Sequence, residues 1–248
     1  MAYTALYRKY RPTNFSSIVG QDVIVDILKN SIINNKVSHA YLFTGPRGTG
    51  KTSTAKILAH AVNCLNSTND ICGECSICKS LDLNDSDIVE IDAASNNGVD
   101  EIRSLRDNVN LMPAFCKYKI YIIDEVHMLS QSAFNALLLT LEEPPEHVIF
   151  ILATTNLESV PITIVSRCQR FEFHRITDKD IVERLKFVCD EENIKYEDDG
   201  LKEIAILADG GLRDAINLLD QVLSLPDENI NIDEVEKLSG KISTQSVY

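Results

Sequence analysis

The chain has 248 residues, of which 44% are hydrophobic and 25% are charged, and its formal net charge is −13. This length fits one large domain or two smaller ones, and the composition is that of a soluble globular protein. Because phosphate contacts require a basic surface, the acidic balance argues against a stand-alone nucleic-acid-binding protein. The sequence has neither an apolar run of about 18 residues nor an apolar N-terminal signal, so we expect a cytoplasmic protein without a membrane partner.

Short apolar segments alternate with segments of helical periodicity through the first 177 residues. The apolar segments are 40–43, 88–91, 120–123, 148–152 and 171–173. Continuous apolar runs of this length are typical of strands that are buried on both faces of a parallel sheet. The alternation therefore predicts an α/β fold with a parallel sheet flanked by helices, in which ligands bind at the carboxyl ends of the strands.

Residues 45–52 match GxxxxGK(S/T), the phosphate-binding P-loop pattern, between an expected strand and an expected helix. Glycines let the backbone N–H groups point at phosphate oxygens, and the positive end of the next helix strengthens this anion site. We expect Lys51 to reach the β- and γ-phosphates and Thr52 to ligate Mg²⁺. The nucleotide-binding residues predicted here are Gly45, Pro46, Arg47, Gly48, Thr49, Gly50, Lys51 and Thr52.

Two acids follow the apolar segment 120–123 directly. Asp124, at the carboxyl end of a buried strand, can hold Mg²⁺ opposite the P-loop, and Glu125 can orient and deprotonate water. Solvated acids also end many strands, but an upstream P-loop requires an acid of this kind. We therefore assign Asp124 to the magnesium ion and Glu125 to the catalytic base.

Three further residues are candidates for contacts with a nucleotide. Thr155 follows the segment 148–152 and could touch the γ-phosphate or the attacking water, although threonine also begins turns. Arg167 is either a surface charge or an arginine finger that is offered to a neighbouring active site. Arg213 lies in the first turn of an expected helix, from which it could bend back to the nucleotide.

Four cysteines form a separate motif, in which residues 72–78 contain two CxxC steps. Thiolates at this spacing can converge on one metal ion, and a fourth cysteine upstream completes a tetrahedral set. Four sulfur ligands leave no open position, so the site would be structural. We predict zinc, with an iron–sulfur cluster or four unliganded thiols as alternatives. The predicted ligands are Cys64, Cys72, Cys75 and Cys78.

The pattern changes near residue 178. Segments 181–189, 201–208, 212–223 and 232–238 all have helical periodicity, and no strong strand occurs among them. We therefore expect a nucleotide-binding domain over residues 1–177, with a zinc module at about 63–80. A small all-helical lid domain is expected over residues 178–248.

Together these motifs resemble the AAA+ ATPases and, within them, the gamma/tau subunits of the bacterial DNA polymerase III clamp loader. The resemblance covers essentially the whole chain, and residues 134–145, which end in Leu-Glu-Glu-Pro-Pro, are its most specific part. The segment 7–21 resembles the family's N-terminal segment near the adenine, which implicates Arg11 in nucleotide binding. The resemblance also implies that Thr155 is the sensor-1 residue, that Arg213 is the sensor-2 residue and that Arg167 acts in trans.

The resemblance implies an ATPase motor with ATP, Mg²⁺ and Zn²⁺ as cofactors, which opens a sliding clamp and loads it on DNA. The implied partners are other clamp-loader subunits, the sliding clamp, primer–template DNA and the polymerase core. Family members continue into a helical collar domain, which we expect to be absent from these 248 residues, so self-assembly and ATP hydrolysis by this chain alone should be weak. The alternatives are a non-hydrolysing scaffold subunit of the same assembly and another AAA+ DNA-processing motor.

Overall fold

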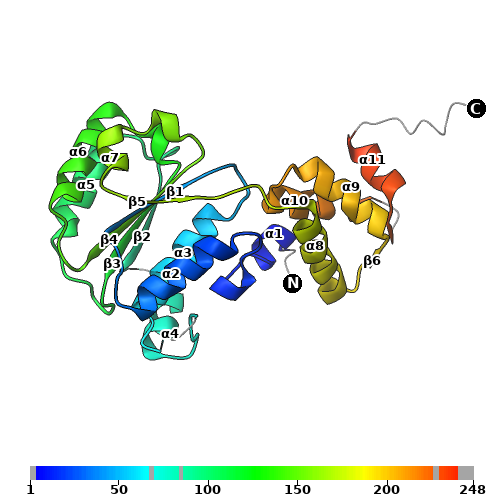
Figure 1. The fold of residues 1–248 in the computed structure, drawn as a ribbon, viewed down its shortest axis with the longest axis horizontal. Helices are drawn as coiled ribbons and strands as arrows, with labels where there is room; N and C mark the ends of the chain where they lie inside the picture. Colours follow the sequence, from blue (N-terminus) through cyan, green and yellow to red (C-terminus); the bar gives the residue numbers. More distant parts are fainter. Residues whose placement is uncertain (1–3, 67–69, 84–85, 226–228, 240–248) are drawn as a thin grey trace, which may run out of the picture.

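The structure is a computed structural model that describes residues 4–66, 70–83, 86–225 and 229–239. Its larger part is a five-stranded sheet of order β2-β3-β4-β1-β5, in which every pair of neighbouring strands is parallel (Figure 1). The order places β1, the strand before the P-loop, between β4 and β5. The strands are β1 (Ala40–Thr44), β2 (Ile88–Asp92), β3 (Lys119–Asp124), β4 (Val148–Thr154) and β5 (Gln169–Glu172).

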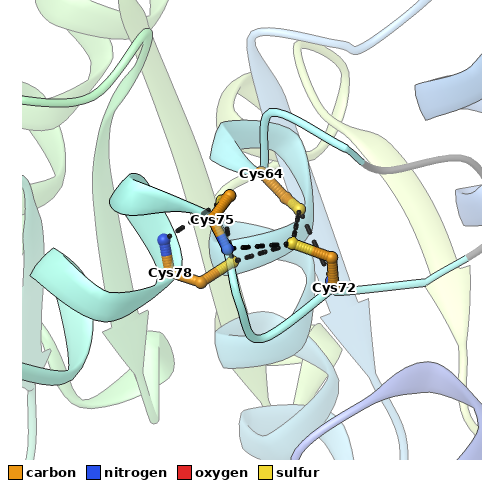
Figure 2. A group of neighbouring side chains, drawn as sticks. All are labelled: Cys64, Cys72, Cys75 and Cys78. Carbon is orange, nitrogen blue, oxygen red and sulfur yellow. Dashed lines mark hydrogen bonds between the residues drawn. The ribbon is translucent and has the colours of Figure 1, made fainter.

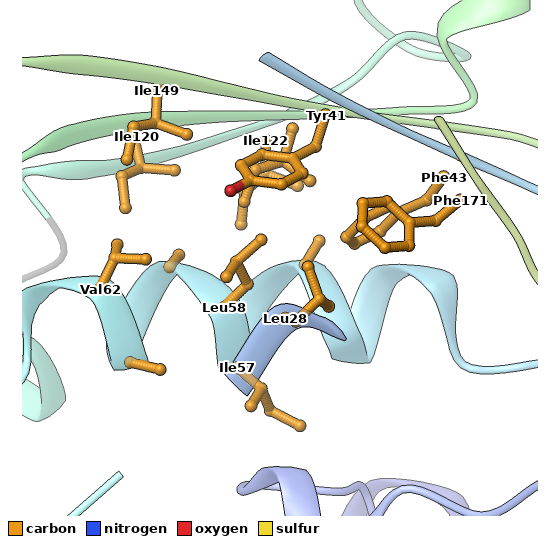
Figure 3. Close-up of a cluster of buried hydrophobic side chains, with 14 of the residues drawn as sticks. Leu28, Tyr41, Phe43, Ile57, Leu58, Val62, Ile120, Ile122, Ile149 and Phe171 are labelled. Atoms are coloured by element: carbon orange, nitrogen blue, oxygen red, sulfur yellow. The ribbon is translucent and has the colours of Figure 1, made fainter. Parts of the chain in front are cut away.

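Helices cover both faces of this sheet, so alternate residues of one strand enter different cores. Tyr41 and Phe43 pack against α2 and α3 on one face (Figure 3), whereas Ala40 and Leu42 pack against the helices of the other face. Burial on both sides explains why the central strands are continuously apolar, and it confirms the predicted α/β class. The first face carries α2 (Asp22–Ile33) and α3 (Lys51–Asn63), and the second carries α5 (Val99–Val109), α6 (Gln131–Glu142) and α7 (Ile162–Val165).

The last strand of the sheet differs from the sequence prediction. We predicted a strand over residues 171–173, but β5 begins at Gln169 and ends at Glu172. Three of its four residues are exposed because β5 lies at the edge of the sheet, so apolarity does not mark its bounds. Phe173 follows the strand and donates its backbone N–H to the Thr44 carbonyl oxygen at 2.7 Å.

The C-terminal part packs helices around a core of its own, which includes Ile181, Leu185, Ile204 and Leu219. Two-residue strands, β6 (Lys195–Tyr196) and β7 (Asn229–Ile230), pair in parallel beside the helices. Such short strands show no alternation in sequence, and the all-helical prediction therefore missed them. The helices are α8 (Asp178–Glu192), α9 (Asp198–Ala208), α10 (Leu212–Val222) and α11 (Ile232–Ser239).

The N-terminal segment contacts both parts of the molecule. Helix α1 (Leu6–Lys9) packs against α10, and Leu6 is buried in the C-terminal core. The short helix η1 (Phe15–Ser17) instead places Phe15 in the core between the sheet and α3. Among the described helices, none is long and apolar enough to cross a membrane.

Candidate functional site

The P-loop turns through glycines between β1 and α3. Gly48 and Gly50 have positive φ angles of 77° and 98°, which other L-residues adopt only at a cost. Gly45 passes so close to Phe173 that an added Cβ would lie 2.2 Å from the Phe173 carbonyl oxygen. The loop can therefore follow this path only with glycine at these positions.

Lys51 is enclosed by the loop that precedes it. Its ammonium group donates to the carbonyl oxygens of Gly45 at 2.8 Å and Pro46 at 2.7 Å. The side chain is buried, and burial lowers the pKa of Lys51, while the carboxylates of Glu125 and Asp124 oppose this shift. The lysine is thus a buried cation beside two acids, at the start of α3.

The two predicted magnesium ligands lie in direct contact. The Thr52 hydroxyl donates to the Asp124 Oδ2 atom at 2.6 Å, although the two residues lie 72 positions apart in sequence. The Asp124 Oδ1 atom accepts the backbone N–H of Glu125 at 2.9 Å, which fixes the carboxylate at the end of β3. Hydroxyl, carboxylate and water oxygens are ligands that Mg²⁺ accepts, so this pair fits the ion.

Glu125 has a left-handed backbone, with φ 48° and ψ 43°, and polar groups surround its carboxylate. The Thr155 hydroxyl donates to Glu125 Oε2 at 3.1 Å, and His127 Nδ1 lies 3.4 Å from the same oxygen. His127 Nδ1 also lies 3.0 Å from the Thr154 hydroxyl oxygen. Non-glycine residues with positive φ are concentrated at functional sites, where surrounding contacts hold them. His127 was not among the predicted site residues, although its position two residues after the predicted base was an available signal.

A cavity of about 730 Å³ joins Lys51, Thr52, Asp124, Glu125 and Thr155. It also reaches residues that were not among the predicted site residues, namely Lys56 in α3, Glu90 and Asp92 in β2 and Tyr7 in α1. Gly45, Pro46, Arg167 and the four motif cysteines do not line it. The predicted residues that do line the cavity are Arg11, Arg47, Gly48, Thr49, Gly50, Lys51, Thr52, Asp124, Glu125, Thr155 and Arg213.

The C-terminal part closes one side of the cavity through α10. The backbone N–H of Leu212 donates to the Gly48 carbonyl oxygen at 3.1 Å, so the P-loop touches the start of this helix directly. The next residue, Arg213, places its guanidinium 5.1 Å from the centre of the Tyr7 ring. Arg11 Nε lies 3.3 Å from the Ser53 hydroxyl oxygen at the start of α3.

Arg167 points to a different surface of the same chain. Its guanidinium donates to Glu142 Oε1 at 2.7 Å and to the Thr163 carbonyl oxygen at 2.6 Å. These partners belong to the end of α6 and to α7, and the arginine side chain is one-third exposed. Arg167 therefore does not face the cavity of its own chain.

The four cysteines converge at the far end of α3 (Figure 2). All four sulfur atoms lie within 4.8 Å of one another, with 3.4 Å between Cys64 and Cys72 and 3.4 Å between Cys75 and Cys78. A tetrahedral Zn–S distance of about 2.3 Å places sulfur atoms roughly 3.8 Å apart. Cys64 directly follows α3, and Cys78 lies in α4 (Ser76–Leu83). The donor set therefore fits one tetrahedral metal ion.

Hydrogen bonding divides the four thiols into two kinds. Burial raises the pKa of Cys64 and of Cys78. Backbone N–H groups of Glu74 and Cys75 lower the pKa of Cys72. Burial alone would raise the pKa of Cys75, but hydrogen bonds from backbone and thiol donors lower it to about 6. N–H groups that stabilise sulfur as a thiolate also suit it as a metal ligand.

The sheet order, the P-loop and the helical part beside the cavity define the class, a AAA+ nucleotide-binding protein. Solved structures of the Thermotoga maritima RuvB Holliday junction branch migration motor share this fold, with a TM-score of 0.68 at 22% identity over 93% of this chain and 72% of that chain. Residues 20–177 match the family described as DNA polymerase III, delta subunit, and residues 180–228 match the DNA polymerase III clamp loader subunit, ATPase lid domain. The chain belongs to the gamma/tau subunit family of bacterial DNA polymerase III, whose members below are 43–54% identical to it.

Named relatives support this membership along nearly the whole chain. The DNA polymerase III subunit tau of Bacillus subtilis is 54% identical over 98% of this chain and 44% of the relative. The DNA polymerase III subunit gamma of Buchnera aphidicola subsp. Acyrthosiphon pisum is 44% identical over 97% of this chain and 67% of the relative. Subunit tau of Escherichia coli K12 is 43% identical over 98% of this chain and 38% of the relative. The chain thus spans less than half the length of both tau subunits.

Proposed function

We propose that this chain is the ATP-binding and ATP-hydrolysing part of a clamp-loader subunit in DNA replication. The observation that carries the proposal is the convergence of Lys51, the Thr52–Asp124 pair and Glu125 on one cavity. A scaffold subunit that only binds its neighbours would not need a catalytic base at the position of Glu125. The intact set therefore favours the motor over the non-hydrolysing alternative. The relatives' names favour it over another AAA+ DNA-processing motor.

Each residue of the set has a distinct role in the proposed reaction. Lys51 would exchange its two loop carbonyls for β- and γ-phosphate oxygens, while Thr52 and Asp124 would hold Mg²⁺. When bound, that ion would neutralise the charge that develops on the phosphates. Glu125 would orient and deprotonate the attacking water, with Thr155 donating a hydrogen bond to the glutamate carboxylate.

We propose two domains that meet at the nucleotide, residues 1–177 and the lid of residues 178–248, with a zinc module at about 63–80. Arg213 and Arg11 would contact the nucleotide from the lid and from the N-terminal segment. The contact between Leu212 and Gly48 supports this arrangement, because it joins the lid to the P-loop. A change in the conformation of the P-loop on phosphate binding would then directly alter the position of the lid.

The proposed partners follow from family membership. The subunit would work in a cytoplasmic hetero-oligomer with other clamp-loader subunits, where Arg167 would reach the ATP of a neighbour. ATP binding would open the sliding clamp, and hydrolysis on primer–template DNA would release it to the polymerase core. The outward position of Arg167 supports a role between subunits.

Replacing Lys51 with alanine tests the nucleotide site. We expect ATP affinity to fall by at least about tenfold, because a charge-assisted hydrogen bond contributes about 1.5–3 kcal/mol. Affinity can be measured by titration with a fluorescent ATP analogue and Mg²⁺. Lys202→Ala is the matched control, since this exposed lysine on α9 pairs with Asp199 away from the cavity. Equal affinity of Lys51→Ala and wild type would refute the site.

Metal analysis tests the cysteine site. We propose zinc as its ion, and we expect about one zinc per purified chain, because one four-thiolate set binds one ion. Cys78→Ser should lose most of this metal, whereas Cys189→Ser, a buried cysteine in α8, should retain it. Iron with visible absorbance would indicate a cluster instead, and metal-free protein would indicate four free thiols.

A further inference from the structure

The N-terminal segment forms one wall of the cavity described above. Residues that line the cavity occur along it from α1 to the stretch after η1, beginning at Tyr7 and ending at Val19. Its first part is held by the lid, through Leu6 N–H to Asp220 at 3.3 Å and through Lys9 to Glu192 at 2.5 Å. The position of this wall therefore depends on what fixes its other end.

Asp70 fixes that other end. Its Oδ1 atom accepts the backbone N–H of Phe15 at 2.9 Å, and its Oδ2 atom accepts that of Ser16 at 2.9 Å. Both carboxylate oxygens are thus used on adjacent N–H groups of a segment more than 50 positions away in sequence. The Phe15 side chain is 1% exposed, so these hydrogen bonds hold the backbone of a residue whose ring packs in the core. Hydrogen bonds to a charged acceptor are about twice as strong as those between neutral groups.

Asp70 in turn belongs to the cysteine module. It lies two residues before Cys72, and the intervening Ile71 packs against the core that contains Phe15. Cys72 Sγ lies 3.4 Å from Cys64 Sγ and 3.9 Å from Cys78 Sγ. A metal ion that joins these sulfur atoms would fix Cys72, and hence Asp70, relative to the end of α3.

The module is too distant to touch a nucleotide itself. Helix α3 has 13 residues, beginning at Lys51 of the P-loop and ending just before Cys64, which corresponds to a length of roughly 20 Å at about 1.5 Å per residue. An effect of the cysteines on the cavity must therefore pass through connected parts of the chain. The contacts of Asp70 with Phe15 and Ser16 provide such a connection.

We propose that Asp70 is a positioning residue through which the four-cysteine metal site holds the N-terminal wall of the nucleotide cavity. The ligand part of this proposal rests on the proposed ATP site. The metal ion fixes the position of Cys72, and Asp70 transmits that position to the backbone of Phe15 and Ser16. The wall from Tyr7 to Val19 is thereby kept in place for the nucleotide. The metal thus contributes to nucleotide affinity without contacting the nucleotide.

The test compares Asp70→Ala with wild type, each with zinc and after removal of zinc by a chelator. In the zinc-loaded proteins, we expect Asp70→Ala to weaken binding of a fluorescent ATP analogue by about fivefold or more, the lower end of coupling between distant sites. Zinc content should stay unchanged, and hydrogen exchange of residues 4–19 should accelerate. Asp26→Asn, which removes an exposed charge on α2, should behave as wild type.

Combining Asp70→Ala with zinc removal distinguishes coupling between the metal site and the nucleotide cavity from general damage to the fold. Removing zinc should weaken nucleotide binding in wild type but add little in Asp70→Ala, because the connection is already broken. Additive effects, or wild-type affinity and exchange in zinc-loaded Asp70→Ala, would overturn the proposal while leaving the ATP site intact. If zinc-free protein unfolds, the zinc-loaded variant still decides the question. Wild-type affinity of Lys51→Ala would instead remove the ATP site on which the proposal rests.

Discussion

Replacing Arg167 with alanine should lower the ATPase rate of the assembled clamp loader by about 10³–10⁵-fold, as loss of an arginine finger does. ATP binding by the single chain should not change, because the arginine does not line its own chain's cavity. Its guanidinium is held by Glu142 and the Thr163 carbonyl, which orients it outward before any neighbour binds. Orientation in advance reduces the entropy that the finger loses when it engages a phosphate.

A second arginine provides the control for this result. Arg170 is exposed on β5 and pairs with Glu172 at 3.0 Å, so Arg170→Ala removes the same charge from nearby. Steady-state ATPase assays on assembled complexes, with binding assays on single chains, separate the two variants. If Arg167→Ala and Arg170→Ala assemble and hydrolyse ATP equally well, Arg167 is only a surface charge.

Replacing Glu125 with glutamine should lower turnover by about 10²–10⁴-fold, the usual contribution of a general base. ATP affinity should remain near that of wild type. Glutamine has the same shape and can still accept the Thr155 hydroxyl, which the carboxylate accepts at 3.1 Å. It cannot take a proton from water at neutral pH, so the loss is confined to the chemical step.

The controls for this variant test both the charge and the fold. Glu146→Gln removes an exposed carboxylate before β4 and should leave turnover unchanged. Single-turnover measurements with saturating ATP then report the chemical step separately from binding. Normal turnover by Glu125→Gln would show that another group is the base, and His127 would be the next residue to replace.

The sheet was predictable because its central strands are buried on both faces, which makes their sequences continuously apolar. The same argument fails at β5, where an edge strand exposes Gln169, Arg170 and Glu172 and so lacks the apolar signal. It fails again for β6 and β7, whose two residues each are too few for a pattern. Strand prediction therefore succeeded for the central strands and for β2, an edge strand that keeps three apolar residues. It failed at β5, β6 and β7, where exposed polar residues or short length remove the signal.

The candidate site also contains residues that could be predicted from the sequence and contacts that could not. Local spacing was sufficient to select the P-loop, the acids at the end of β3 and the four cysteines, because each set is defined within a short segment. Contacts that join distant segments left no local pattern, such as Tyr7 beneath Arg213 and Asp70 against Phe15. The direction of Arg167 also depends on the packing of α6 against α7, which the sequence could not supply.

We propose that ATP binding and hydrolysis in the cavity at the P-loop set when a clamp-loading assembly opens and releases its clamp. The most direct measurement is the steady-state ATPase rate of a clamp loader that contains this sequence, with and without the sliding clamp and primed DNA. We predict a low rate without clamp and DNA and strong stimulation when both are present, abolished by Glu125→Gln. A rate that does not respond to clamp and DNA, or an assembly that hydrolyses no ATP in their presence, would contradict the claim.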